Sequence, residues 1–153
     1  MKRKSAGILI YRFAGKDLEV LLVHPGGPFW AKKDIGAWSI PKGEFDEEEE
    51  PLEAAIRELK EETGLTVSGD FIPLEPVKQK SGKLVIAWAI EFDCDPEQVT
   101  SNFFEMEWPP NSKIIKIFPE VDKAAWFNLE EASQKIIPGQ FPILMELASV
   151  VKK

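Results

Sequence analysis

The sequence predicts an α/β domain in which helices cover both faces of a mixed β-sheet. Apolar segments of strand length occur in both halves of the chain, and helical patterns lie between and after them. This alternation favours a layered α/β arrangement over an all-helical or all-strand fold. The length of 153 residues suits one domain spanning residues 1–153.

The strand predictions rest on apolar runs bounded by turn residues. Residues 5–13 (SAGILIYRF) and 18–24 (LEVLLVH) form the first pair, joined by a turn at 14–17 that contains Gly15. Further short strands are predicted at residues 37–40, 65–67, 71–79, 83–93 and 124–127. Residues 95–122 contain four prolines and are predicted to be irregular.

Residues 52–63 form the clearest predicted helix. Pro51 suits the first helical position, and Gly64 suits the residue just past the end. Small or apolar residues recur at three- and four-residue steps: Leu52, Ala55, Ile56, Leu59 and Thr63. Two further helices are predicted at 129–136 and 141–151, separated by Pro138-Gly139.

Composition excludes several classes of function. Cys94 and His24 are the single cysteine and histidine, so a zinc site built from these residue types is ruled out. The net charge of −7 argues against general nucleic-acid binding, which depends on a basic surface. No apolar run approaches the roughly 20 residues that cross a bilayer. No signal-peptide cleavage pattern is present, and we therefore expect a cytoplasmic protein without a membrane partner.

The negative charge is concentrated around the predicted helix. Residues 44–62 contain ten acidic residues against two basic ones. At about 100° per residue, Glu58, Glu61 and Glu62 share one sector of the helix, where their charges repel. A divalent cation would relieve this repulsion, and oxygen ligands suit Mg²⁺ or Mn²⁺. A solvated acidic surface is the ordinary reading of such a run, so the spacing of the other residues decides between the two.

That spacing extends over residues 43–65. Gly43 is followed by five residues and Glu49, then by seven residues and the run Arg57-Glu58-Leu59-Lys60-Glu61-Glu62-Thr63-Gly64-Leu65. This arrangement resembles the Nudix box, in which glycine, glutamate, arginine–glutamate, an aliphatic residue, paired glutamates, glycine and an aliphatic residue stand at these intervals. All nine fixed positions match, and the chain is identified as a member of the Nudix hydrolase family.

The resemblance implies a Nudix-type α/β/α sandwich with a mixed β-sheet and a Mg²⁺- or Mn²⁺-dependent hydrolase. The implied metal ligands are Glu58, Glu61 and Glu62, of which Glu61 and Glu62 also serve catalysis. The implied structural positions are Gly43, Glu49, Arg57 and Gly64, with Glu49 and Arg57 bracing the loop as a pair. The implied reaction is attack of water on a diphosphate linkage.

Two segments outside the box add candidate residues. Trp38-Ser39-Ile40-Pro41-Lys42 resembles the approach to the box in members that act on dinucleoside polyphosphates, inositol pyrophosphates or 5′-triphosphorylated RNA. Lys42 and Trp38 are therefore predicted to bind substrate. Glu120 resembles a late glutamate that serves the family as a further metal ligand or general base. Glu105 and Glu107 stay open as other candidates for the base.

The predicted substrate is a small nucleotide with a diphosphate linkage, of which a dinucleoside polyphosphate is the leading example. A nucleoside triphosphate or ADP-ribose is the alternative within the same reaction class. A non-catalytic nucleotide sensor is the alternative from another class, although such domains usually lose box carboxylates that this chain retains. A 5′ RNA end is disfavoured by the net acidity but stays open.

Overall fold

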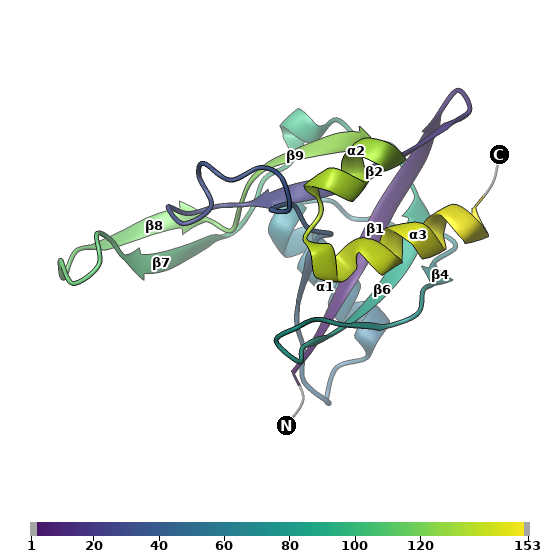
Figure 1. Ribbon diagram of the computed structural model, residues 1–153. Coiled ribbons are helices and arrows are strands. Elements are labelled where there is room, and N and C mark those ends of the chain that lie inside the picture. The colour runs from purple at the N-terminus through teal and green to yellow at the C-terminus, as the bar shows by residue number, and fades with distance from the viewer. Residues whose placement is uncertain (1–2, 152–153) are drawn as a thin grey trace.

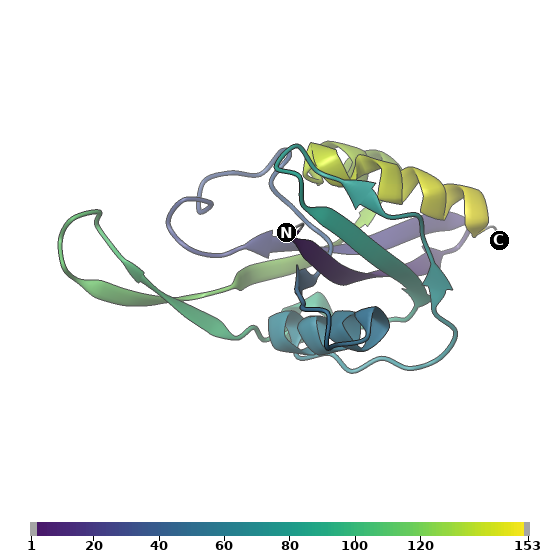
Figure 2. The same cartoon turned by 90° about the horizontal axis from the view of Figure 1, so that it is seen from below.

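The computed structural model describes residues 3–151, in which a mixed β-sheet lies between helices (Figures 1 and 2). The helices are α1 (Pro51–Thr63), α2 (Leu129–Lys135) and α3 (Phe141–Val150), with the 3₁₀ turns η1 (Pro96–Gln98) and η2 (Pro138–Gln140). The strands are β1 (Lys4–Ala14), β2 (Asp17–Pro25), β3 (Lys42–Glu44), β4 (Ile72–Pro73), β5 (Val77–Lys78), β6 (Leu84–Glu91), β7 (Phe103–Glu107), β8 (Ile115–Pro119) and β9 (Val121–Asn128).

The main sheet has the order β4-β6-β1-β2-β9, with β3 paired to β1 and β5 to β6. β1 and β6 run parallel, whereas the other pairs are antiparallel, which confirms the predicted mixed sheet. β3 pairs with the start of β1, with Gly43 opposite Ala6. This pairing places Lys42 and the first residues of the box next to β1.

Alternating residues of β1 divide the core into two layers, one on each face of the sheet. Ile8 and Ile10 belong to the layer that contains Leu59 of α1. Leu9 belongs to the layer that contains Leu144 of α3. The period of two along a strand sends successive side chains to opposite faces, so both helical layers are bound to the same central strand. Figure 2 shows α1 on one side of the sheet and α3 on the other.

Helix α1 begins and ends where the sequence predicts. Pro51 occupies its first turn, and Gly64 adopts a left-handed φ of 76°. The Gly64 N–H donates to the Lys60 carbonyl at 2.8 Å, which closes the last turn. Leu59 and Ala55 are fully buried against the sheet, as the apolar stripe indicated.

The prediction that residues 95–122 are irregular is wrong. β7 and β8 form a two-stranded antiparallel hairpin that projects away from the main sheet (Figures 1 and 2). Pro96 begins the 3₁₀ turn η1, and the other three prolines lie in the turn and at the end of the hairpin, where a missing N–H costs no ladder hydrogen bond. The Glu107 carboxylate accepts hydrogen bonds from the N–H groups of Asn111 and Lys113, both of which have a φ of 63°. The turn is therefore closed by its own side chain.

Two smaller strand predictions also fail. Residues 37–40 form only two isolated bridges, Val23–Ser39 and Trp38–Ile136, and residues 65–67 form no strand. Both segments are short and contribute buried side chains without a continuous strand partner. No helix within residues 3–151 combines the length and the apolar character needed to cross a bilayer.

Candidate active site

A cleft of about 190 Å³ opens where α1, β3 and the start of β9 meet. Its lining contains two acidic side chains, Glu62 and Glu120, and the basic side chain of Lys42. The remaining lining residues are Val23, Pro25, Trp30, Ser39, Ile40, Val121 and Ile137. Five segments of the chain form this partly apolar hollow, and three of them contribute its charged groups.

Glu62 lies on the side of α1 that faces this cleft. Burial raises the pKa of Glu62 to about 8, and the neighbouring charge of Glu58 adds to the shift. The Lys42 N–H donates to Glu62 Oε1 at 3.3 Å, which acts in the opposite direction by favouring the carboxylate. A nearby cation would therefore strongly stabilise the ionised form of Glu62.

Glu58 is buried between α1 and β3. A Cβ at Gly43 would overlap the Glu58 carboxyl group, so only glycine leaves room for it. Burial raises the pKa of Glu58 to about 7, with a further contribution from Glu61, which hydrogen bonds to it. Gly43 thus serves close packing, and its backbone does not require a left-handed φ.

Arg57 joins the loop before α1 to the helix itself. Its guanidinium donates to both carboxylate oxygens of Glu49, at 2.7 and 2.9 Å. It also donates to Glu61, the closer oxygen lying at 3.1 Å. Bidentate pairs of this kind hold a fixed geometry, and the hydrogen bond from Arg57 lowers the pKa of Glu49. Glu53, one turn before Arg57 on α1, is exposed.

The two residues predicted to bind substrate have different environments. Lys42 lines the cleft, and burial followed by the charge of Lys83 lowers the pKa of its ammonium group. Trp38 is only 4% exposed, its indole N–H donates to Asp34 at 2.8 Å, and its ring packs against Phe127. Trp38 is therefore a core residue without a surface for substrate, which corrects the prediction for its side chain.

Glu120 precedes β9 and reaches the same cleft. Burial and the charge of Glu61 raise the pKa of its carboxyl group. Its carbonyl accepts from the Gly26 N–H at 2.9 Å, which connects it to the loop that follows β2. The neighbouring candidates Glu105 and Glu107 lie on the projecting hairpin, and neither lines the cleft.

Asn102 links Glu120 to α1, and sequence reasoning did not find it. Its N–H donates to the Glu61 carbonyl at 2.8 Å, and its own carbonyl accepts from the Glu120 N–H at 2.9 Å. With the amide nitrogen facing the acceptors, its side chain donates to Glu120 Oε2 at 3.1 Å and to the Glu61 carbonyl at 3.2 Å. No local pattern marks this residue, because its partners lie on other elements.

Near the cleft, the histidine has a structural environment. His24 is fully buried; its Nδ1 lies 2.8 Å from Asp122 Oδ1 and its Nε2 lies 2.6 Å from the Lys33 carbonyl. Both ring nitrogens are thus engaged. The imidazole fixes the loop after β2 to the sheet.

The donor set of this region consists of carboxylate oxygens. Among residues 3–151, no three acidic, histidine or cysteine side chains converge into a complete metal-binding group. The carboxylates instead influence one another in pairs, Glu58 with Glu61 and Glu62 with Glu58. This chemistry fits a hard divalent cation. A bound cation would offset the free-energy cost of ionising these buried carboxyl groups and would remove the repulsion between their charges.

Comparison with known proteins agrees with this geometry. The sequence model of the NUDIX domain family matches residues 1–147. An RNA pyrophosphohydrolase from Bartonella henselae is 39% identical, over 96% of this chain and 88% of its own length. The asymmetrical bis(5′-nucleosyl)-tetraphosphatase of Rattus norvegicus is 29% identical, over 88% and 84% of the two chains.

A solved structure supports the fold independently. The crystal structure of a C. elegans Ap4A hydrolase binary complex aligns with a TM-score of 0.63 and 24% identity, over 95% of this chain and 96% of that one. At this identity the likeness concerns the fold alone. The family match over nearly the whole chain, the relatives and the cleft lead to one conclusion: the chain belongs to the NUDIX family and is a hydrolase of phosphoric anhydride bonds.

Proposed function

We propose that this hydrolase uses Mg²⁺ to cleave a diphosphate linkage in a dinucleoside polyphosphate. The observation that carries the proposal is the cleft in which Glu62, Glu120 and Lys42 lie together. Acidic groups for a metal and a basic group for a phosphate are the two components that such a substrate requires. The name of the rat relative, a bis(5′-nucleosyl)-tetraphosphatase, supports this substrate class.

Hydrolases of this family generally need a divalent metal. We assign its ligands to Glu58, Glu61, Glu62 and Glu120, all of which offer oxygen. When bound, Mg²⁺ would neutralise charge on the phosphate oxygens and lower the pKa of the attacking water. The raised pKa values of Glu58 and Glu62 support the assignment, since both groups are costly to ionise without a cation.

The chain's own residues then have separate tasks. Glu62 or Glu120 would accept the proton of the attacking water, because both carboxyl groups line the cleft. The Lys42 ammonium group would contact a phosphate oxygen. Arg57 would keep Glu61 in place through the ion pairs that it forms with Glu49 and Glu61.

A 5′-triphosphorylated RNA end is the second candidate substrate. The Bartonella henselae relative is named an RNA pyrophosphohydrolase and is 39% identical to this chain. Against this stands the net charge of −7, which gives no general attraction for a polyanion. Both candidate substrates would be cleaved at a diphosphate linkage. They differ in the group attached to the phosphates, which is a second nucleoside in one and an RNA chain in the other.

A substrate screen tests the proposal. Purified protein with Mg²⁺ would be incubated with diadenosine tetraphosphate, a nucleoside triphosphate, ADP-ribose and 5′-triphosphorylated RNA, and the products separated by chromatography. We expect the dinucleotide to have the highest kcat/KM, and EDTA to abolish turnover until Mg²⁺ or Mn²⁺ is restored. A higher kcat/KM for 5′-triphosphorylated RNA would show that the substrate is an RNA end and not a dinucleoside polyphosphate. Sustained turnover in EDTA would refute the metal assignment.

A further inference from the structure

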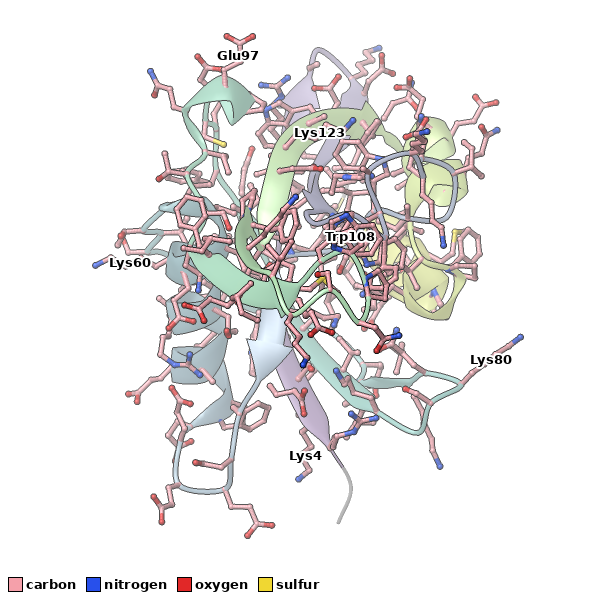
Figure 3. All side chains as sticks on the ribbon, turned by 90° about the vertical axis from the view of Figure 1, so that its left-hand side faces the viewer. Lys4, Lys60, Lys80, Glu97, Trp108 and Lys123 are labelled. Atoms are coloured by element: carbon pink, nitrogen blue, oxygen red, sulfur yellow. The ribbon has the colours of Figure 1, made fainter. Side chains whose placement is uncertain are left out.

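Two segments on one side of the molecule meet through aromatic side chains. The β7–β8 hairpin and the loop of residues 26–36, which follows β2, extend in the same direction (Figures 1 and 2). The rings of Phe29 and Trp108 lie edge to face, with centroids 5.4 Å apart. A Cβ at Gly27 would come within 3.0 Å of Phe104 Cζ, so the loop backbone also touches the hairpin. Figure 3 looks onto this side and shows Trp108 where the two segments meet.

The hairpin has two different faces. Phe104 and Met106 alternate with Phe103, Glu105 and Glu107 along β7, so the two sets lie on opposite faces. The face of Phe104 turns toward the 26–36 loop, whereas Phe103 on the other face is 64% exposed. We call the rings on the loop side and on the loop itself the aromatic wall. Its members are Phe29, Trp30, Phe104, Trp108 and Phe118.

The aromatic wall continues directly from the cleft. Trp30 lines the cleft together with Glu62 and Glu120, and the next residue along the wall is Phe29, which contacts Trp108. The Lys33 ammonium group lies 5.2 Å from the centre of the Trp30 ring. Adjacent residues of the loop therefore place one ring at the cleft, beside the Lys33 ammonium group, and the other ring against the hairpin.

The root of the hairpin is held against those ligands. Asn102 stands immediately before β7 and Glu120 immediately after β8, and they are joined by a backbone hydrogen bond of 2.9 Å. Asn102 also donates to the carbonyl of Glu61 on α1. The position of the wall is thus fixed relative to the acidic residues of the cleft.

The ring of Phe29 is largely free to contact a ligand. Phe29 remains 57% exposed although its ring contacts Trp108. An aromatic residue that served only to hold two segments together would be expected to bury most of its ring. An exposed ring adjacent in the chain to Trp30, which lines the cleft, is suited to stacking on the flat face of a nucleobase.

We propose that the aromatic wall is a subsite for a nucleobase of the substrate, the base farther from the cleaved linkage in a dinucleoside polyphosphate. This inference rests on the proposed function and deepens it. The phosphates would occupy the cleft at Glu62, Glu120 and Lys42, and Lys33 would lie near the phosphate that leads to the base. The wall would then select substrates with a second base over shorter nucleotides.

The test separates binding of the base from binding of the phosphates. Diadenosine tetraphosphate would be the substrate, and inorganic tetrapolyphosphate a competitor that lacks a base. We expect Trp108→Ala to raise KM for the dinucleotide about tenfold, the size associated with loss of one stacked base. The inhibition constant of tetrapolyphosphate should not change. Phe29→Ala repeats the test from the loop, in case Trp108→Ala fails to fold.

Phe103→Ala is the matched control, because it removes an aromatic ring from the opposite face of the same hairpin. It should leave both constants at the wild-type value. The inference is overturned if Trp108→Ala weakens dinucleotide and tetrapolyphosphate equally, if it weakens neither, or if Phe103→Ala has the same effect. Should the wild type hydrolyse no diphosphate, the proposed function fails. Calorimetric binding of diadenosine tetraphosphate to the same variants then still decides whether the wall binds a base.

Discussion

Helix α1 lines the cleft and the β7–β8 hairpin starts and ends beside it, at Asn102 and Glu120, but the two elements are stabilised in different ways. α1 buries Ala55 and Leu59 against the sheet and is linked to its preceding loop by the Arg57–Glu49 ion pair. The hairpin pairs only with itself and leaves Phe103 and Ile117 exposed on its outer face. Groups that must hold a metal and a water in fixed geometry gain from a rigid element.

This difference divides the expected effects of substitution. A change among the acidic residues of α1 should reduce kcat, whereas a change on the aromatic wall should act on KM. Asn102 and Glu120 lie between the two regions, because they join the hairpin to the helix. Variants of these two residues therefore show best whether the hairpin affects kcat as well as KM.

The largest effect is expected at Glu62. Glu62→Gln should lower kcat by about a hundredfold or more, the loss that corresponds to several kcal/mol of metal stabilisation. The variant should not melt earlier than the wild type without metal, because it removes a buried, mutually repelled carboxyl group. Glu53→Gln, on an exposed position of α1, is the control and should retain full activity. Early melting of Glu62→Gln would make Glu62 a structural residue instead.

Glu120→Gln tests which role the late carboxylate has. If Glu120 is the general base, kcat should fall strongly, Mg²⁺ affinity should stay constant, and the low-pH limb of the rate profile should flatten. If it is a metal ligand, high Mg²⁺ should restore part of the activity by mass action. Kinetics within about threefold of wild type would remove Glu120 from the site. Rates measured over Mg²⁺ concentration and pH distinguish these outcomes.

Asn102→Ala should have an intermediate effect, about tenfold in kcat/KM, since a residue that orients a ligand acts through it. Asn102→Asp should be no better, because a carboxylate cannot donate to Glu120 and adds a like charge. Gln98→Ala, which removes an exposed amide nearby, serves as the control. Steady-state kinetics at several Mg²⁺ concentrations provide the measurement. Equal activity of wild type and Asn102→Ala would show that the hairpin root does not position Glu120.

The smallest effect concerns stability and pH. The folded-state pKa values of Glu58 and Glu62 are raised to about 7 and about 8 from 4.5. Their contribution to stability is therefore complete below pH 4.5 and is lost as the pH rises through 7 and 8. Without metal, we expect the melting temperature to be a few degrees lower at the alkaline end of this window than at the acid end. Mg²⁺ should stabilise the protein more at the alkaline end, and Glu62→Gln should reduce the pH dependence.

Much of the fold followed from local pattern. Helix α1, the β1–β2 pair and β6 are coded by hydrophobic periodicity and by residues such as Pro51 and Gly64, whose preferences hold wherever they stand. The hairpin of residues 103–119 escaped prediction, since its strands are short and most of its exposed side chains find no partner on the main sheet.

In the candidate site, too, some features followed from the sequence and others only from the tertiary structure. The box spacing by itself determined which carboxylates share one side of the helix, because fixed intervals along a helix set those distances. The pairing of Arg57 with Glu49 was implied by the family resemblance, and the structure contains it. Only the tertiary structure decided that Trp38 is buried while Trp30 lines the cleft, and that Asn102 joins Glu120 to Glu61. Burial and such contacts depend on strand register and on segments far apart in the chain, which no local interval encodes.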